Sequence, residues 1–469
     1  MLPLRDISLV LIVFGSLPFI FVRPHIGILM WSWISYMVPH RMSWDFARYF
    51  QFAMVIAIVT ILAWALSREP KKLPMHMITI LFIVFTIWIS ITTLFAVSPS
   101  AAYERWDTTI KVFAMTILTL FLMQERKRID LLIWVIVCSV GFFGVKGGIW
   151  TVLGGASGGR VYGPPGGFFA ENNALGLALV MVVPLMWYLQ SQTENFYVKW
   201  GLRGAMALCM LAVVGTNSRG SALAAGAMVM LLLIKSRKRA LLVLGLVVGV
   251  IAVIPFIPER WYDRIESIKE YEEDTSALGR IQAWTYAVRL ALDRPIVGGG
   301  FKAETNSELY RSYIPDADKV RAFHSIYFQT LGEHGFIGLA IFLLLGFSAF
   351  ATGTGIIRRT RGSPELSWAN DLARMVQVSI FGYAVGGAFL NLAFFDLYYH
   401  LVAIMLLVKV VVAKEEAELA KTQKEPALSA PQSHFERARM RGGPATAPAD
   451  ASPPLARSDT SLRQTFRSR

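Results

Sequence analysis

The sequence predicts an all-α polytopic membrane protein with about twelve transmembrane helices. Of its 469 residues, 55% are hydrophobic and only 17% are charged, whereas about a quarter of the residues in a soluble domain are charged. This deficit is informative because charged side chains are costly to expose to lipid. Apolar stretches of about 20 residues, long enough to cross a bilayer as a helix, recur along the chain. These observations exclude an ordinary soluble globular protein.

The apolar stretches account for most of the chain. They lie at about 7–22, 26–39, 49–67, 75–97, 107–123, 128–153, 171–190, 198–215, 219–235, 238–257, 325–356, 371–393 and 397–413. The first stretch follows Arg5 and Asp6 and lacks a small-residue cleavage site. We therefore expect it to stay in the membrane as part of the protein and not to be removed as a signal peptide.

Basic residues between the stretches predict the side of each connection, because Lys and Arg collect in cytoplasmic loops. Basic groups at 68–72, 126–128, 199–203, 235–239 and 358–361 alternate with connections poor in positive charge at 98–106, 154–170, 216–218 and 394–396. This alternation assigns a side to every connection after residue 68. It places the long connection 258–324 outside and the C-terminal tail in the cytoplasm.

A cytoplasmic N-terminus agrees with this alternation only if 7–39 makes one crossing. Each of its two apolar stretches is shorter than a usual span, and Pro18 and Pro24 interrupt them. We therefore expect one broken crossing here and both termini in the cytoplasm. One observation disagrees with this topology, because Arg41 and Arg48 then lie in an outer loop.

The predicted organisation has four parts. A transmembrane region at 1–257 makes nine crossings, and a second transmembrane region at 325–413 makes three. Between them, 258–324 forms a large periplasmic loop, in which the apolar pattern of 276–294 predicts a helix. The tail at 414–469 is rich in Ala, Pro, Ser and Arg and is expected to be disordered, because it cannot bury a hydrophobic core.

The net charge of +14 does not by itself indicate nucleic acid binding. The basic residues lie mainly between the apolar stretches and in the tail, which is the distribution that membrane topology produces. We expect membrane lipids, and no nucleic acid, as partners. Cys138 and Cys209 both lie in apolar stretches and are expected to be small buried side chains.

Arginines recur in the connections assigned to the outer side. Arg160 lies in the connection 154–170, Arg219 in the short connection TNSRG and Arg280 in the long loop. A guanidinium binds phosphate oxygens through two parallel hydrogen bonds and stays charged at every relevant pH. Arg219 also begins a helix, where the helix dipole favours an anion. These three arginines predict a diphosphate site. The alternative is snorkelling at the membrane interface for Arg219 and a solvated charge on a helix for Arg280. Arg260 and Arg264 are better explained as solvated or headgroup contacts.

His324 stands where the outer loop re-enters the membrane and is the only histidine of that loop. An imidazole has a pKa near neutrality and can accept a proton from a hydroxyl, so His324 is the candidate catalytic base. The alternative is a structural histidine at a helix start. Glu333 and His334 are interpreted as structural polar groups. The sequence has no HExxH, CxxC or clustered Asp motif, so we expect neither a metal nor another cofactor.

Four other residues are possible substrate contacts. Glu171, Asn172 and Asn173 follow a Gly-rich segment and are suited either to contact sugar hydroxyls or a lipid headgroup or to cap a helix. Lys146 is an ionisable residue near the outer end of its stretch, which suggests a site, although snorkelling explains it equally well. The Gly-rich segment 154–167 lacks the GK[ST] ending and the preceding strand of a phosphate loop. We expect it to be an irregular loop beside a cavity.

Four stretches between about 160 and 340 resemble the O-antigen ligase and polymerase superfamily of bacterial envelope glycan assembly. They are GGFFAENNALG, TNSRG, GRIQAWTYAVRLALDRPIVGGG and HSIYFQTLGEHGFIG. The N-terminal third resembles, less specifically, the ligases associated with exosortase-linked glycosylation. The resemblance implies a GT-C-like glycosyltransferase of the bacterial inner membrane that needs no metal and has its active site on the periplasmic face.

The resemblance also implies substrates and residue roles. Members of the superfamily move a glycan from undecaprenyl diphosphate to an acceptor hydroxyl, usually on the lipid A core, with inversion if that hydroxyl attacks directly. Arg219 and Arg280 match the diphosphate-binding arginines of the family, and His324 matches its base. The sequence departs from the family pattern at the next residue, where Ser325 stands in place of the common Asn.

An O-antigen ligase is the leading hypothesis, and three alternatives stay open. A polymerase of the same superfamily would use another lipid-linked repeat unit as its acceptor, and a protein O-oligosaccharyl ligase would use an exported protein. A lipid or glycan transporter belongs to a different class. It would usually show internal repeats and ion sites at the membrane midplane, and the sequence shows neither.

Overall fold

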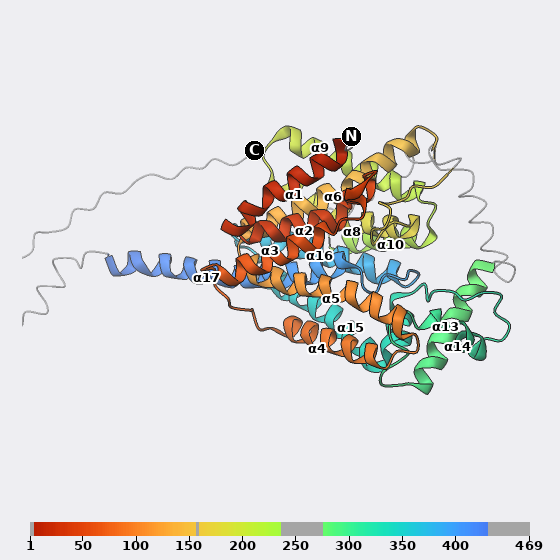
Figure 1. Cartoon of the computed structure of the whole chain (residues 1–469). Coiled ribbons are helices and arrows are strands. Elements are labelled where there is room, and N and C mark those ends of the chain that lie inside the picture. The colour runs from red at the N-terminus through yellow and green to blue at the C-terminus, as the bar shows by residue number, and fades with distance from the viewer. Residues whose placement is uncertain (1–3, 156–158, 236–274, 430–469) are drawn as a thin grey trace, which may run out of the picture. The chain divides into compact units, whose positions relative to one another are not determined.

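The computed structural model describes residues 4–155, 159–235 and 275–429, and every regular element within these ranges is a helix (Figure 1). The stretch predicted at 238–257 and the loop residues Arg260 and Arg264 lie outside the described residues. By its internal contacts the chain divides into two units, Met1–Glu415 and Glu416–Arg469. The helix bundle and the candidate site belong to the first unit.

The bundle consists of helices joined by mostly short connections. They are α1 (Leu4–Val22), α2 (His25–Met37), α3 (Phe52–Leu66), α4 (Met77–Leu94), α5 (Pro99–Leu122), α6 (Arg126–Val152), α8 (Asn172–Gln192), α9 (Phe196–Gly215), α10 (Arg219–Lys235), α15 (Ile326–Arg359), α16 (Ser367–Gly387) and α17 (Asp396–Ser429). Two short 3-10 helices, η1 (Pro39–Met42) and η2 (Phe46–Arg48), join α2 to α3. An outer segment before α15 contains α13 (Thr275–Asp293), η4 (Ala303–Thr305) and α14 (Ser307–Tyr313).

Seven of the described helices are long and apolar enough to cross a membrane, namely α1, α4, α6, α8, α9, α15 and the Asp396–Thr422 part of α17. The apolar helices Phe52–Leu66 and Arg219–Ile234 are shorter. The chain is therefore an all-helical polytopic membrane protein, while the total of about twelve crossings stays a prediction. In α8 and α17, 83% of the apolar window is buried, so these two helices form the centre of the bundle.

The bundle has two ends, and the first, which we call the basic end, carries most of the predicted cytoplasmic basic groups. Arg128 Nη1 donates to Glu69 Oε2 at 2.7 Å, and Gln124 Nε2 donates to the carbonyl of Lys72 at 2.9 Å. Lys414 Nζ donates to the carbonyl of Gln124 at 3.3 Å. These contacts bring the α3–α4 and α5–α6 connections together with the first-unit part of α17.

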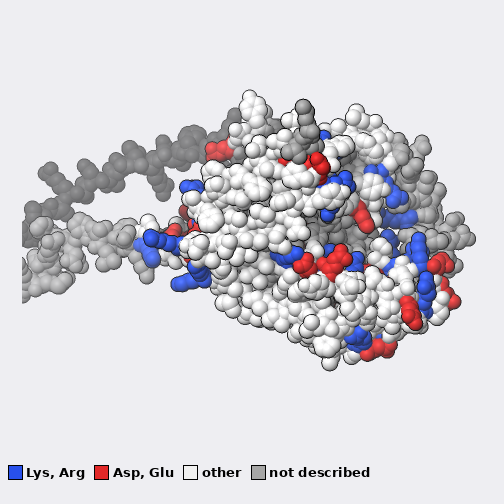
Figure 2. Space-filling view, viewed as in Figure 1, with Lys and Arg blue, Asp and Glu red and all other residues white. Residues whose placement is uncertain are grey.

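The opposite end, which we call the loop end, carries the other connections. The N–H of Val97 donates to the carbonyl of Gly299 at 2.8 Å and joins the α4–α5 connection to the outer segment. Ser35 Oγ donates to Asp396 Oδ2 at 2.6 Å and joins the end of α2 to the start of α17. Figure 1 shows α13 and α14 at this end. In Figure 2, Lys and Arg gather toward both ends and the face between them is mostly uncharged, as expected for a lipid-facing surface.

α1 and α2 form an antiparallel hairpin, which differs from the single broken crossing predicted for 7–39. The buried carboxylate of Asp6, near the start of α1, accepts hydrogen bonds from the backbone N–H groups of Trp44 (3.4 Å) and Ala47 (3.2 Å), which follow α2. The chain reverses beside Pro24, which has no N–H to continue α1 and disfavours helical geometry in the residue before it. Pro24 therefore marks a reversal and not the kink that was expected.

The hairpin changes the predicted topology. Arg5 Nη1 donates to the carbonyl of Met42 at 3.2 Å, so the start of α1 lies at the loop end. α17 runs from Asp396 at the loop end to Lys414 at the basic end. The beginning and the end of the first unit thus lie at opposite ends of the bundle, and the expectation that both termini share the cytoplasmic side does not fit this arrangement.

Two further expectations concern the outer segment and the tail. The helix predicted at 276–294 is confirmed as α13, and it contributes to a small hydrophobic core that is separate from the main one and includes Tyr286 and Phe323. The tail was expected to be disordered from residue 414, but α17 continues to Ser429. Residues 414–429 are rich in Ala, Glu, Leu and Lys, which are strong helix formers, and this explains the difference.

Candidate active site

The turn between α9 and α10 positions Arg219 at the loop end. α9 ends at Gly215, Asn217 adopts a left-handed φ of 54°, and α10 begins at Arg219. Asn tolerates this conformation better than most residues. Ser218 Oγ accepts hydrogen bonds from the backbone N–H of Ser221 at 3.2 Å and from its hydroxyl at 2.9 Å, which caps the helix. Arg219 therefore starts a well-anchored helix whose N-terminal dipole favours an anion.

The Gly-rich connection after α6 packs on this turn and is irregular, as the sequence predicts. The N–H of Val161 donates to the carbonyl of Gly215 at 3.1 Å, and Asn217 Nδ2 donates to the carbonyl of Gly159 at 3.4 Å. Arg160 lies between these two anchored residues, and its side chain is exposed. The structure thus brings Arg160 to the edge of the Arg219 turn, on its solvent-facing side.

The three polar residues at the start of α8 have different environments. Asn172 is buried, and its Nδ2 donates to the carbonyl of Thr216 at 2.8 Å, so this side chain joins α8 to the turn. The carbonyl of Asn173 accepts a hydrogen bond from Ser221 Oγ at 3.1 Å, and its side chain is half-buried. Glu171 occupies the N-cap position without a side-chain capping bond and is exposed.

His324 lies at the junction between the outer segment and α15. Its backbone has a left-handed φ of 48°, which costs energy in a non-glycine residue and persists because the surroundings impose it. Trp284 of α13 donates its Nε1–H to the carbonyl of Phe323 at 2.9 Å and stacks on Phe328 with ring centroids 5.0 Å apart. Ser325 is buried at the N-cap of α15. α13 therefore fixes where His324 stands relative to α15.

Burial and three neighbouring charges set the protonation of His324. Burial lowers the pKa of its imidazole most, the charges of Arg280 and Arg321 lower it further, and the charge of Glu171 raises it. The imidazole is therefore neutral near pH 7 and able to accept a proton. The sequence interpretation missed Arg321, although it lies in the same arginine-rich loop. Its guanidinium packs over Gly279, where an added Cβ would lie 2.3 Å from the guanidinium carbon.

The end of α16 connects the His324 side of the site with the Arg219 side. A Cβ added at Gly220 would lie 3.5 Å from Phe389, and one added at Gly387 would lie 2.7 Å from Ile326. Phe389 also lies beside Trp284, with ring centroids 6.5 Å apart. The loop end thus gathers four of the candidate residues from different elements: Arg219, Arg280, His324 and Glu171.

Lys146 has a different position. It is exposed on α6, whereas its neighbours Gly147 and Gly148 face the packed interior, where added Cβ atoms would lie 2.4 Å from Val161 and 2.2 Å from the backbone of Leu208. An exposed lysine on an apolar helix is explained by snorkelling of its ammonium group toward the interface. The structure therefore favours this explanation over a role in the site.

α15 is interrupted at Gly335, a feature that the sequence interpretation did not include. Gly335 has a φ of 70° and a ψ of −172°, outside the helical region. The N–H of Phe336 donates to the carbonyl of Pro295 at 2.9 Å, and the N–H of Gly300 donates to the carbonyl of Glu333 at 2.7 Å. The outer segment therefore satisfies the backbone groups that the break releases, as a membrane-embedded break requires.

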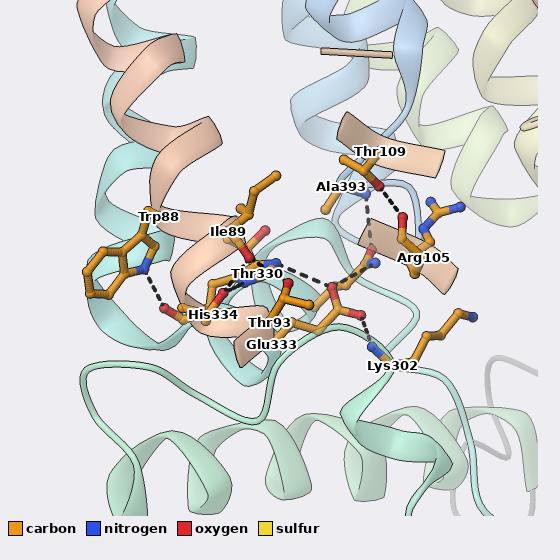
Figure 3. Close-up of polar contacts among 12 residues, drawn as sticks. Trp88, Ile89, Thr93, Arg105, Thr109, Lys302, Thr330, Glu333, His334 and Ala393 are labelled. Carbon is orange, nitrogen blue, oxygen red and sulfur yellow. Dashed lines mark hydrogen bonds and ion pairs between the residues drawn. The ribbon is translucent and has the colours of Figure 1, made fainter. Parts of the chain in front are cut away.

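Figure 3 shows the polar side chains around this break. The carboxylate of Glu333 accepts hydrogen bonds from the N–H of Lys302 at 3.0 Å and from Gln329 Nε2 at 3.3 Å. Gln329 Oε1 in turn accepts one from the N–H of Ala393 at 3.1 Å. A single buried carboxyl group thus links the outer segment to the connection between α16 and α17.

His334 belongs to the same buried cluster. Its Nδ1 pairs with Thr92 Oγ1 at 2.6 Å, and Trp88 Nε1–H donates to its carbonyl at 3.1 Å, so it holds the outer half of α4 (Figure 3). These contacts agree with the interpretation of Glu333 and His334 as structural polar groups. Among the residues that the structure describes, no group of three His, Cys, Asp or Glu is arranged to hold a metal ion.

The geometry of the loop end defines a class of protein. It is an all-helical membrane protein in which arginines and a neutral histidine share one end of the bundle, an arrangement suited to binding an anionic group and accepting a proton. Residues 204–343 match the family described as O-Antigen ligase, and this stretch contains Arg219, Arg280 and His324. This match supports an O-antigen ligase-type superfamily for the chain.

The comparisons add two further findings. Residues 4–194 match a family of unknown function (DUF5935), so Glu171 and Asn172 come from one matched region and His324 comes from the other. No curated protein matches the chain. The match supports a function of the O-antigen ligase and polymerase type, a family that implies lipid-linked glycan substrates.

Proposed function

We propose that the protein is an O-antigen ligase that transfers a glycan from undecaprenyl diphosphate to a sugar hydroxyl of the lipid A core. The observation that carries this proposal is the position of His324 where the charges of Arg280, Arg321 and Glu171 act on its imidazole. A base next to two cations is suited to a reaction in which a hydroxyl loses a proton while a diphosphate leaves. The Arg219 turn lies at the same end of the bundle.

The proposed reaction is a direct displacement. The acceptor oxygen forms a bond to the anomeric carbon while the bond from that carbon to the diphosphate oxygen breaks, and the electron pair leaves with undecaprenyl diphosphate. His324 takes the proton of the acceptor hydroxyl. Arg219 and Arg280 bind the diphosphate and neutralise the charge that develops on it, and Arg160 contributes from the edge of the site. Attack from the opposite side inverts the anomeric configuration.

The proposed orientation follows from the basic residues. Because Lys and Arg collect in the cytoplasm, the basic end faces the cytoplasm and the loop end faces the periplasm of the bacterial inner membrane. This orientation gives lipid-linked glycans access to the arginines from the outer leaflet. With the α1–α2 hairpin it also puts the start of α1 in the periplasm and the end of the first unit in the cytoplasm.

The test of the proposed base is the variant His324→Ala in purified full-length protein. Transfer should fall by roughly 10²–10⁴-fold, the usual contribution of a general base, while binding of the undecaprenyl-diphosphate donor stays within twofold. The matched control is His76→Ala at the basic end, next to Lys409, which should retain transfer. Normal transfer by His324→Ala would remove the proposed base.

Glycan profiles of a gene deletion distinguish the ligase from the polymerase. A ligase deletion leaves free lipid A core and accumulates long lipid-linked polymer, because polymerisation continues without transfer. A polymerase deletion instead leaves core that carries a single repeat unit. The second profile would replace the ligase proposal with the polymerase.

A further inference from the structure

The connection between α2 and α3 carries two arginines that the predicted topology did not explain. Arg41 and Arg48 lie at the loop end and line a cavity of about 440 Å³. The cavity lies over α2 between α3 and α5, since its walls include Trp31, Ala57 and Lys111 from these three helices. It is separate from the Arg219 turn and from His324, neither of which lines it.

The polar side of the cavity carries positive charge from arginines that form no ion pair with the described part of the chain. Among the described residues, Lys111 is paired with Asp107 at 2.5 Å, whereas no ion pair includes Arg41 or Arg48. The buried carboxylate of Asp6 accepts hydrogen bonds from two N–H groups of the same connection and is in no ion pair with either arginine. Uncompensated arginines of this kind bind phosphate groups through paired hydrogen bonds.

Two observations show that Arg41 belongs to a built surface. A Cβ added at Gly166 would lie 3.3 Å from Arg41 Nε, so the guanidinium packs closely on the Gly-rich loop. His40, on the cavity wall, is kept uncharged because burial and the charge of Arg41 lower its pKa to about 4. The field at this wall thus comes from arginine and persists over the physiological pH range.

The other side of the cavity is apolar and extends to the depth of the membrane. Its wall continues along α3 to Ala57, about 8 Å from the start of that helix at 1.5 Å per residue. Beside it, Trp44 and Tyr49 are 75% and 77% exposed, as is typical of aromatic side chains at the membrane interface. An occupant therefore needs a charged head at the interface and an apolar body in the hydrocarbon.

We propose that this cavity binds a phosphate-bearing membrane lipid, with the phosphate on Arg41 and Arg48 and the hydrocarbon chains against α2 and α3. A free phosphate ion would leave the apolar wall unoccupied, and an uncharged lipid would leave the arginines unpaired. This site goes beyond the proposed transfer reaction and does not depend on it, because it needs neither Arg219 nor His324.

The site is nevertheless coupled to the candidate active site through one loop. Gly166 and Phe168 line the cavity, and Arg105 lies over the Phe168 ring at 5.5 Å. Glu171 follows three residues after Phe168, and its charge raises the pKa of His324. A lipid bound in the cavity therefore contacts the loop that leads directly to the residues around His324.

The experiment is a binding measurement on the full-length protein by native mass spectrometry. Its three probes distinguish binding through the phosphate from binding through the hydrocarbon chains. Dioleoyl phosphatidic acid has both phosphate and chains, dioleoylglycerol has only chains, and inorganic phosphate has only the charge. Phosphatidic acid should bind at least tenfold more tightly than either of the others. In Arg41→Gln/Arg48→Gln its affinity should fall at least tenfold.

The matched control is Arg358→Gln/Arg361→Gln, which removes the same charge from exposed arginines at the basic end and should leave the affinity unchanged. A second variant, Ala57→Phe, fills the apolar wall without changing any charge and should also weaken binding. Equal affinity in wild type and Arg41→Gln/Arg48→Gln overturns the proposal. Dioleoylglycerol or inorganic phosphate binding as tightly as phosphatidic acid overturns it as well, because one half of the site would then be sufficient.

Discussion

At the scale of single residues, the proposed chemistry depends on an imidazole whose charge its surroundings control. The pKa of His324 is lowered from 6.5 by burial and by Arg280 and Arg321. A general base is active when it is unprotonated, so a lowered pKa extends activity toward acid. This environment explains how a histidine beside two cations serves as a base and not as another positive charge.

The pH dependence of transfer follows from this shift. The kcat/KM of the wild type should stay constant down to pH 6.5 and fall only as the pH drops through the lowered pKa of His324. Arg321→Gln removes one of the charges that lower this pKa, so its acid limb should move to higher pH. A wild-type acid limb above pH 6.5, or an Arg321→Gln profile that coincides with the wild type, contradicts the assignment.

The geometry of the guanidinium makes a second residue-scale prediction. Arg219→Lys keeps the charge at the start of α10 but loses the planar pair of donors, so transfer should fall roughly 10²-fold, as for other transition-state hydrogen bonds. Initial rates with saturating acceptor measure the effect. Arg361→Lys at the basic end is the control and should transfer at the wild-type rate. If both variants keep full activity, Arg219 does not bind the diphosphate.

The residues found from the sequence differ in kind from those that were missed. Arg219 and His324 are recognisable because their chemistry and their place in outer connections point to the same function. Asn172 has equally suggestive chemistry, but its amide bonds the carbonyl of Thr216, a partner far away in the sequence. Arg321, which was missed, gains its meaning only from the glycine that it meets in space, which residue type and spacing do not specify.

At the scale of elements, the break in α15 joins this helix to the outer segment at the loop end. The helical pattern of its sequence continues through Gly335, and one glycine weakens a helix by only about 1 kcal/mol. The carbonyl of Pro295, which bonds Phe336 beyond the break, belongs to a different segment. The break is therefore decided by tertiary contacts, and this explains why local sequence did not predict it.

Two glycines of α15 provide a matched test of the break. Gly335→Ala introduces a Cβ at 2.4 Å from the carbonyl oxygen of Ile296 and at a positive φ, so the free energy of unfolding should fall by at least about 1–3 kcal/mol, the cost of such strain. Gly355→Ala lies in open space in the same helix and should raise it by about 0.5–1 kcal/mol. Thermal unfolding in detergent compares the two. Equal melting temperatures would show that α15 tolerates a continuous helix at Gly335.

At the scale of the whole molecule, hydropathy identified the class of protein but not the path of the chain. Long apolar helices such as α4 and α8 were recognisable from composition alone. The hairpin of α1 and α2 was not, because it is fixed by the carboxylate of Asp6 bonding two backbone groups beyond α2. Because the hairpin makes two crossings in place of one, it changes the predicted side of the N-terminus. The assignments after residue 68 stay as predicted, since they follow from the alternation of basic residues and do not depend on the hairpin.

The hairpin leads to a prediction about sidedness that labelling in cells can decide. In a Cys138→Ala/Cys209→Ala background, Tyr49→Cys at the loop end and Arg358→Cys at the basic end introduce single thiols at exposed positions. Removing Cys138 matters because that residue is exposed, contrary to the expectation from its apolar surroundings. A membrane-impermeant maleimide added to intact cells should label Tyr49→Cys and leave Arg358→Cys unlabelled.

An epitope at the N-terminus completes this test, because the two topologies differ there. Asp6 and the connection it holds lie at the loop end, so the epitope should be accessible on the same side of the membrane as the thiol of Tyr49→Cys. A broken single crossing requires the opposite result, with the epitope exposed only after the membrane is permeabilised. Labelling of both thiols from the same side would contradict the proposed orientation itself. The loop end, with Arg219 and His324, would then not be separated from the basic end by the bilayer.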